Sequence, residues 1–238
     1  IWEGKYLHDL YKQAFTPWEW HKQLFEFSKK QGLICFSSPF DLTAVDFLES
    51  LENPIYKIAS FEITDIPLIR KVASKGKPVI ISTGIATKQD IELAITTCKN
   101  EGNHEIALLK CTSSYPAPIS EANLTMIKDF TNRYNVISGL SDHTLGLTAP
   151  IVAVSQGAKI IEKHFIIDKS IGGPDSSFSL DEKEFNQMVN AIREAELSIG
   201  KVEYSLTKKQ MEAKDYSRSL YISEDVKKGD LLLPKMSG

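Results

Sequence analysis

The sequence has few cysteines, no long apolar run and no block of like charge, and each absence excludes a class of protein. Its three cysteines, Cys35, Cys98 and Cys111, include no CxxC pair. This pattern argues against a disulfide framework and fits a reducing compartment. No apolar run approaches the ~18 residues that span a bilayer. The opening residues do not read as a basic region followed by an apolar core. We therefore expect a cytoplasmic protein that does not enter a membrane.

The charges are balanced and mixed along the chain. There are 28 basic and 31 acidic residues, giving a net charge of -3. No surface for nucleic acid or an anionic membrane is expected, so a small molecule is the expected partner. The 238 residues, 42% of them hydrophobic, can form a substantial core. Because the first residue is Ile rather than Met, we expect a fragment or a processed product.

Short apolar runs alternate with segments of helical spacing. The runs expected to be strands lie at 33–38, 56–60, 78–83, 106–114, 136–143 and 159–165. The helices expected after them lie at 43–51, 67–74, 88–99, 121–134, 147–156 and 181–199, and two earlier helices are expected at 6–11 and 18–30. Near-continuous apolar strands between amphipathic helices predict a parallel sheet covered by helices, either open or closed into a barrel.

The positions of the polar residues favour the barrel. Every expected strand ends in side chains suited to a site, as at Ser38, Lys57, Ser82, Ser113 and His143. An open sheet concentrates its ligand at one switch point, whereas a barrel uses the ends of most of its strands. We therefore predict a (β/α)8 TIM barrel with six units visible, and we expect the two missing units to precede Ile1.

The expected domain boundaries follow the composition. The barrel domain, N-terminally incomplete, is expected at 1–200, and the polar stretch 201–217 reads as a linker. Residues 218–238 contain two short apolar runs around a turn at 227–229, the start of a small β-rich module that is too short to fold alone.

Two histidines stand at the ends of successive strands. His143 and His164 are 21 residues apart, about the length of one strand-helix-strand crossover, so they should lie side by side. Two imidazoles could then hold one metal ion. Four charged residues lie nearby, namely Asp142, Glu162, Lys163 and Asp175. A histidine that merely satisfies its hydrogen bonds at a strand end remains the alternative.

Three lysines also end strands. Lys57, Lys110 and Lys163, with neighbouring Ser and Thr hydroxyls, suit a phosphate or a carboxylate. A lysine at a barrel strand end is equally typical of a Schiff-base aldolase, in which the histidines would be acid-base groups.

Seven motifs resemble the sialic acid synthase family. They are FSSPFD (36–41), YKIASFEITD (56–65), ISTG (81–84), KCTSSYPAP (110–118), GLSDHT (139–144), IEKHF (161–165) and GGPDSSFSL (172–180). The opening LYKQAFTPWEWH (10–21) looks like the pseudaminic acid synthase branch. The tail RSLYISEDVKKGD (218–230) is similar to the start of the family's SAF (antifreeze-like) domain.

The resemblance implies a metal-dependent condensation of phosphoenolpyruvate with an amino-sugar aldehyde. For this branch the sugar would be 2,4-diacetamido-2,4,6-trideoxy-altrose and the products pseudaminic acid and phosphate. Carried over by motif, His143 and His164 would hold the metal, usually Mn2+, with Mg2+ or Co2+ as alternatives. The phosphoenolpyruvate site would comprise Ser38, Lys57, Ser60, Ser82, Ser113 and Ser141. Tyr115 and Asp175 would contact the sugar, with Asp175 counted as catalytic.

Glu62 is the candidate for handling the proton, although it could instead orient Lys57. A homodimer is expected for the full-length protein, because the SAF domain would cap a partner's site with an arginine. This chain departs from the family pattern in stopping short of that arginine. It also lacks the first two strands, which supply an acidic residue and a phosphate-binding lysine, and it has Ser113 where the N-acetylneuraminate enzymes tend to have Asn. N-acetylneuraminate or legionaminate synthesis and a non-catalytic remnant remain alternatives.

Overall fold

The computed structural model describes residues 12, 15–173, 175–219 and 221–231. The chain divides into two compact units, Ile1–Ile199 and Gly200–Gly238. The helix expected at 6–11 lies outside the described residues.

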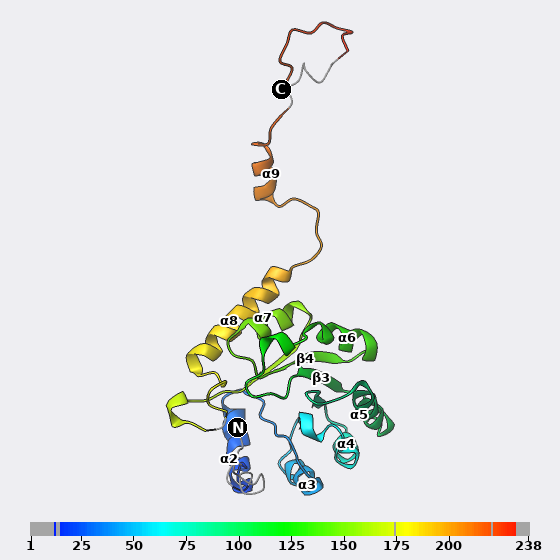
Figure 1. Cartoon of the computed structure of the whole chain (residues 1–238), viewed down its shortest axis with the longest axis vertical. Coiled ribbons are helices and arrows are strands. Elements are labelled where there is room, and N and C mark those ends of the chain that lie inside the picture. Colours follow the sequence, from blue (N-terminus) through cyan, green and yellow to red (C-terminus); the bar gives the residue numbers. More distant parts are fainter. Residues whose placement is uncertain (1–11, 13–14, 174, 220, 232–238) are drawn as a thin grey trace. The chain divides into compact units, whose positions relative to one another are not determined.

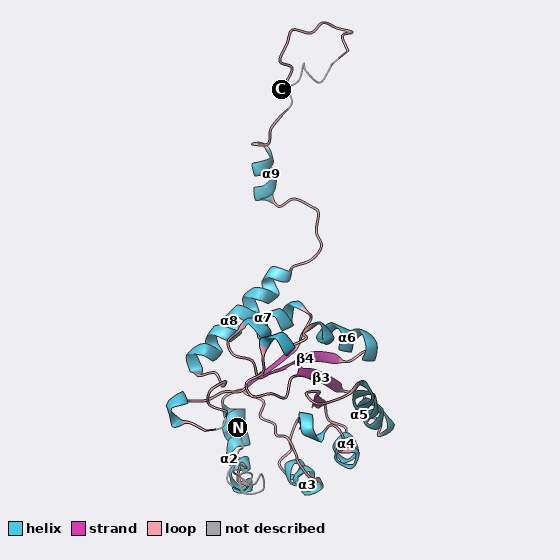
Figure 2. Ribbon diagram, viewed as in Figure 1, coloured by secondary structure: helices cyan, strands magenta, loops and turns pink. Residues whose placement is uncertain are grey.

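A parallel sheet forms the centre of the first unit (Figure 2). Its strands are β1 (Tyr56–Ile58), β2 (Val79–Ser82), β3 (Ile106–Cys111), β4 (Ile137–Asp142) and β5 (Ile160–Lys163). They pair in chain order, β1-β2-β3-β4-β5, and every pair is parallel. The predicted α/β architecture is confirmed, and the described strands make up half of a barrel.

Helices cover the outer side of the sheet (Figure 1). They are α2 (Trp18–Lys30), α3 (Leu42–Ser50), α4 (Ile66–Ala73), α5 (Lys88–Asn100), α6 (Thr125–Tyr134), α7 (Thr148–Ser155) and α8 (Glu182–Ile199). Side-chain caps fix the N-termini of α3 and α5. The Asp41 carboxylate accepts from the backbone N–H groups of Thr43 and Ala44, and Thr87 and Asp90 form a capping box. The helix expected from 121 begins only at Thr125, after a short 3-10 turn and the left-handed Asn123.

The prediction of a strand at 33–38 is wrong. Of this segment only Ser37 forms a bridge, to Tyr56. Leu33 and Ile34 are 66% and 71% exposed. The segment lies beside β1, and the described chain has no strand on its other side. Without a second ladder, its apolar residues bury little surface and its backbone gains few hydrogen bonds.

The pleat of the strands sorts their side chains between two cores. Alternate residues such as Tyr56, Ile58 and Ile81 belong to a large cluster with α3, α4 and α5. The intervening residues Ile80, Ala107 and Leu109 form a small inner cluster with Ile55 and Ile160. The inner face of the sheet is therefore distinct from the helix-facing side, and strand-end residues divide in the same way.

The second unit contains α9 (Lys208–Lys214), whose first turn is closed by a capping box between Thr207 and Gln210. This helix lies within the stretch that reads as a linker. A turn forms near Gly229, where the Lys227 N–H donates to Asp230 Oδ2 at 2.7 Å. Residues 232–238, part of the expected SAF segment, lie outside the described residues.

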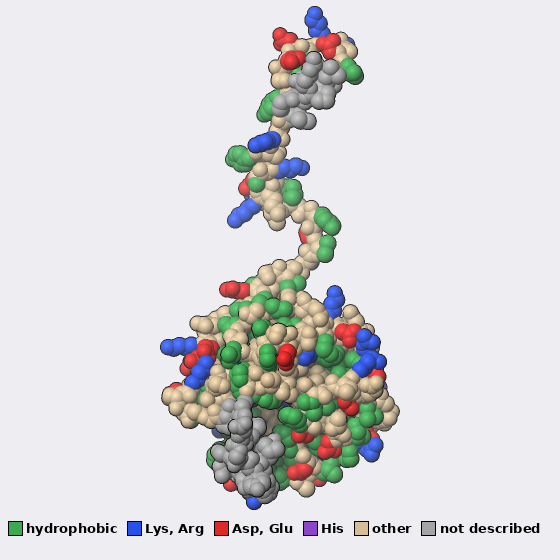
Figure 3. All heavy atoms as spheres, in the orientation of Figure 1, with side chains coloured by type: hydrophobic (Ala, Val, Ile, Leu, Met, Phe, Trp, Pro, Cys, Tyr) green, Lys and Arg blue, Asp and Glu red, His purple; other side chains and the backbone are tan. Residues whose placement is uncertain are grey.

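Across the described residues, no helix is both long and apolar enough to span a membrane. On the face drawn in Figure 3, the Lys and Arg side chains of the first unit lie among Asp and Glu side chains.

Candidate active site at the strand ends

The inner face of the sheet gathers most of the predicted site residues at its carboxyl edge. Lys57 pairs with Ile80 in the ladder and so shares its inner face. Its side chain is buried, with Nζ 3.6 Å from Glu162 Oε2. Glu162 Oε1 accepts a hydrogen bond from Ser141 Oγ at 2.5 Å. Strands β1, β4 and β5 thus contribute to one polar cluster.

Glu162 has no assigned role in the sequence analysis, yet it occupies the centre of this cluster. The available signal was its place two residues before His164, which puts both on the same face of the chain. Its contacts with Lys57 and Ser141 could not be read from the sequence because they cross the sheet.

A second cluster surrounds Gly84. The Gly84 N–H donates to Ser60 Oγ at 3.0 Å. A Cβ built on Gly84 would lie 2.1 Å from Ser113 Oγ, 2.7 Å from Ser60 Oγ and 3.0 Å from Cys111 Sγ. Glycine is therefore required here for space rather than for its backbone angles. Because glycine has no side chain, the hydroxyls of Ser60 and Ser113 can both occupy the space beside Gly84 at the edge of β2.

Several buried polar atoms near these clusters have no hydrogen-bond partner among the described residues. They are Ser82 Oγ, Ser113 Oγ, Glu62 Oε2 and Thr144 Oγ1. Buried polar groups are nearly always paired, so unpaired ones at one edge of a sheet point to a bound group that completes them. Ser38 makes no hydrogen bond to another predicted site residue in the part of the chain that the structure describes.

The two histidines lie side by side, as their spacing predicts. β4 and β5 are neighbouring strands, and the two imidazole centroids are 5.2 Å apart. His143 Nδ1 is 3.0 Å from the Thr112 carbonyl oxygen. A carbonyl can only accept, so Nδ1 carries the hydrogen and the Nε2 lone pair is free. This is the tautomer that a metal ligand requires, with its second nitrogen held by the backbone.

Aromatic and acidic side chains enclose the histidines. The Tyr115 ring lies 4.4 Å from His143, and Phe178, which is buried, lies 4.9 Å from His164. Asp175 Oδ2 is 3.4 Å from His164 Nδ1. Tyr115 and Asp175, both predicted to contact the sugar, therefore reach the site from different loops.

The surroundings shift the pKa values of His143, His164 and Glu62. Burial lowers the pKa of His143, but hydrogen bonds to Cys111 and to the Thr112 carbonyl outweigh burial and hold this pKa above its ordinary value. Burial lowers the pKa of His164, and the opposing Asp175 carboxylate does not cancel the shift. Burial also raises the pKa of Glu62, against a backbone hydrogen bond and the charge of Lys57. The shift at His164 favours the neutral ring that metal binding requires, whereas the shift at His143 favours a protonated ring, from which a metal would displace a proton. The shift at Glu62 moves its pKa toward the range of an acid-base group.

The described residues include no group of three or more His, Cys, Asp or Glu side chains placed to hold a metal ion. His143 and His164 fit a metal as a pair, because their rings are neighbours and a donor at Nδ1 of His143 leaves its Nε2 to bind the ion. Two protein ligands would leave several coordination positions for water and substrate oxygens.

The prediction that three lysines share one anion site is wrong for two of them. Lys110 lies two residues after Leu108, on the helix-facing side, where its Nζ donates to the Cys111 carbonyl at 2.6 Å and to Thr112 Oγ1 at 3.1 Å. Lys163 pairs with Asp142, and its side chain is 0% exposed. The two-residue period of a strand sends both away from the inner face, which leaves Lys57.

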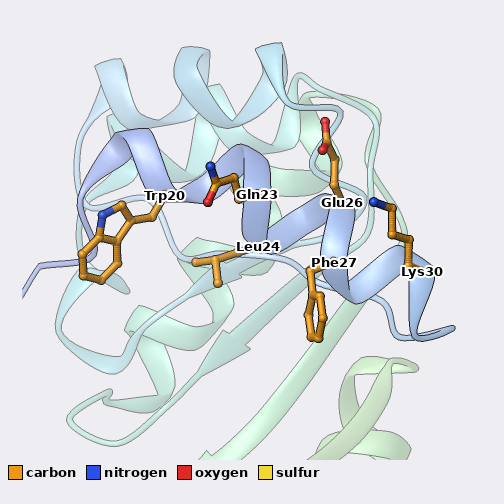
Figure 4. A pocket seen from close by; sticks show the side chains of 6 residues that line it. All are labelled: Trp20, Gln23, Leu24, Glu26, Phe27 and Lys30. Carbon is orange, nitrogen blue, oxygen red and sulfur yellow. The ribbon is translucent and has the colours of Figure 1, made fainter.

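A separate hollow lies on α2. It measures about 540 Å³ and follows one side of α2, where Leu24 and Phe27 project together (Figure 4). Its lining also includes Trp20, which is 58% exposed. The titratable groups there are Glu26 and Lys30, so this hollow offers an apolar surface and no catalytic chemistry.

Comparisons with known proteins agree with this geometry. Residues 1–204 match the NeuB family. The pseudaminic acid synthase of Campylobacter jejuni is 46% identical over 97% of this chain, which spans 67% of that protein. The pseudaminic acid synthase of Helicobacter pylori is also 46% identical, over 98% of this chain and 68% of its own length. The chain thus spans about two thirds of these relatives.

A solved structure shows the same fold. The N-acetylneuraminic acid synthetase of Leptospira borgpetersenii, crystallised with citrate, superposes with a TM-score of 0.82 at 32% identity. The match covers 90% of this chain and 75% of that one. Because the family match covers most of the chain and the relatives carry it at high identity, the chain belongs to the NeuB family, the family of the nonulosonic acid synthases.

Proposed function

We propose that the protein is a pseudaminic acid synthase, which condenses phosphoenolpyruvate with 2,4-diacetamido-2,4,6-trideoxy-altrose and releases phosphate. One observation carries the proposal: buried serine hydroxyls without partners lie at the same strand edge as the inner-facing Lys57. The branch assignment is supported by the 46% identity to two pseudaminic acid synthases.

Lys57 and the serines bind phosphoenolpyruvate. The Lys57 ammonium supplies the charge, while Ser82 and Ser113 supply hydroxyls that are free to donate to anionic oxygens. Ser60 and Ser141 lie beside them and already have one partner each, Gly84 and Glu162. Schiff-base chemistry of the aldolase kind needs a neutral amine, and the 3.6 Å ion pair of Lys57 Nζ with Glu162 Oε2 does not favour it.

His143 and His164 hold a divalent metal, for which Mn2+ is the expected ion. When bound, the metal supplies Lewis-acid polarisation of the aldehyde. Tyr115 and Asp175 flank the imidazoles and orient the sugar next to them.

Glu62 manages the proton. Hydration of the oxocarbenium that follows carbon-carbon bond formation releases a proton, and an acceptor must lie close by. The Glu62 carboxyl is half-buried, its Oε2 is unpaired, and burial raises its pKa toward that of an effective acid-base group.

The test is a phosphate-release assay on the complete gene product. Phosphoenolpyruvate is supplied with the altrose derivative and, separately, with the sugars used by N-acetylneuraminate and legionaminate synthases. Release with the altrose derivative at the highest kcat/KM is expected. Preference for another sugar would refute the proposed substrate. Phosphate release with none of the sugars would refute the proposed synthase activity. Borohydride with pyruvate should trap no covalent adduct.

A further inference from the structure

A fully buried ion pair is formed by Asp142 and Lys163, the residues that directly precede the two histidines. Lys163 Nζ is 2.7 Å from Asp142 Oδ2, and the two side chains are 0% and 1% exposed. Asp142 Oδ1 also accepts from the Thr144 N–H at 2.9 Å, and Lys163 Nζ donates to the Thr144 carbonyl. The proposed reaction uses neither charge, although both are held in one closed network.

Stability alone does not explain this pair. Removing two charges from water costs several kcal/mol per ion, and an apolar pair of similar volume is often equally stable or more stable. A buried ion pair is better explained where it fixes a geometry that an apolar contact would leave loose.

The position of the pair indicates which geometry it fixes. Asp142 and Lys163 are register partners, and β4 and β5 both end at them. The next residues are His143 and His164. Past this point the two strands pair with other segments. The His143 carbonyl accepts a hydrogen bond from the Ala117 N–H and the His164 carbonyl accepts one from the Leu180 N–H, both at 2.9 Å.

Adjacent residues of a strand point to opposite faces, so the pair faces the helices while the histidines face inward. The ionic link is thus the last direct connection between the two strands before the imidazoles. Metal ligands must be held to within about 0.5 Å of their working positions. A change in strand separation at Asp142 and Lys163 passes directly to rings whose centroids are 5.2 Å apart.

We propose that Asp142 and Lys163 are positioning residues that set the separation of His143 and His164 for metal binding. The inference rests on the proposed metal site. It concerns a pair that touches neither metal nor substrate and acts through the backbone of the two histidines.

A neutral pair tests the proposal. Asp142→Asn with Lys163→Met keeps the side-chain volumes and an acceptor for the Thr144 N–H, but it removes both charges and the hydrogen bond from Lys163 Nζ to the Thr144 carbonyl. In the complete gene product, Mn2+ binding is measured by EPR titration of the free ion, and folding by circular dichroism and Tm. We expect Mn2+ affinity to fall at least tenfold while the fold and Tm are retained.

A more exposed ion pair serves as control, with side chains 26% and 36% exposed. Glu49→Gln with Lys77→Met removes another ion pair, 2.8 Å long, near the starts of β1 and β2. It should leave Mn2+ affinity unchanged. Parent affinity in the Asp142→Asn, Lys163→Met protein would overturn the proposal, as would an equal loss in the control.

Two further variants complete the test. Should the neutral pair fail to fold, Asp142→Glu keeps both charges and moves the carboxylate by one methylene. Weaker Mn2+ binding at unchanged Tm then supports the proposal, and unchanged binding refutes it. His143→Ala separates this question from the proposed function: if the parent and His143→Ala bind Mn2+ equally, the metal site itself is wrong.

Discussion

Filling the space at Gly84 should weaken phosphoenolpyruvate binding while leaving the protein folded. In Gly84→Ala the new methyl group would lie 2.1 Å from Ser113 Oγ and 2.7 Å from Ser60 Oγ. Both distances are far inside van der Waals contact, so something must move. The nearest atoms end short side chains, and the Ser113 hydroxyl can turn about one bond to escape.

The magnitude follows from the hydroxyls displaced. A hydrogen bond to a charged group contributes about 1.5–3 kcal/mol. Since about 1.4 kcal/mol is a factor of ten, loss of the Ser113 contact alone predicts a roughly ten- to hundredfold rise in KM for phosphoenolpyruvate. Overpacking of the fold costs about 1–3 kcal/mol, which lowers Tm by several degrees in a domain of this size.

The assay is steady-state phosphate release, with each substrate varied at saturating concentrations of the other. Ser113→Ala is the matched comparison, because it removes the hydroxyl that the methyl group would displace. The double variant Gly84→Ala, Ser113→Ala should resemble Gly84→Ala alone, since both changes affect one contact and cannot add.

A parent KM for phosphoenolpyruvate in Gly84→Ala would show that the cluster of Ser60, Ser113 and Gly84 is not the anion site. An equal rise in KM for the sugar would contradict the reasoning as well, because it would indicate general distortion. Strict additivity in the double variant would mean that Gly84 acts on some group other than Ser113.

Three other predictions follow from the geometry. His143→Ala and His164→Ala should each abolish Mn2+-dependent turnover with unchanged circular dichroism, and parent activity of either variant in chelator would refute the metal site. Lys57→Ala should raise KM for phosphoenolpyruvate about ten- to hundredfold, through loss of a charge-assisted contact. Equal changes for both substrates would contradict this role. Leu24→Gln with Phe27→Gln should lower the light scattering of the protein, because those side chains are 45% and 63% exposed. Unchanged scattering in that double variant would contradict the last expectation.

The sequence was sufficient to predict the order of elements because each strand is a short apolar run and each helix has its own periodicity. The spacing of His143 and His164 also predicted neighbouring strands, since one crossover of that length leads to an adjacent position in a parallel sheet. The segment 33–38 had the same apolar signal. It failed to become a strand because pairing depends on a neighbour that its own residues do not specify.

The side of the sheet on which a residue lies could not be predicted. A strand that is buried on both faces is apolar throughout, so it lacks the alternation that would mark its inner residues. This is why Lys57, Lys110 and Lys163 looked equivalent. The Gly84 contacts were equally hidden, because they join residues that follow three different strands.

The two faces also differ in where some of their polar groups find partners. On the helix-facing side, Thr83 Oγ1 donates to the Leu109 carbonyl at 3.0 Å, and Lys163 pairs with Asp142. At the inner edge, the hydroxyls of Ser82 and Ser113 have no partner among the described residues. Paired groups can hold strand ends in place, whereas unpaired ones are costly unless a ligand completes them. The same strand ends therefore carry a fixed outer frame and an inner edge whose donors remain available to an anion.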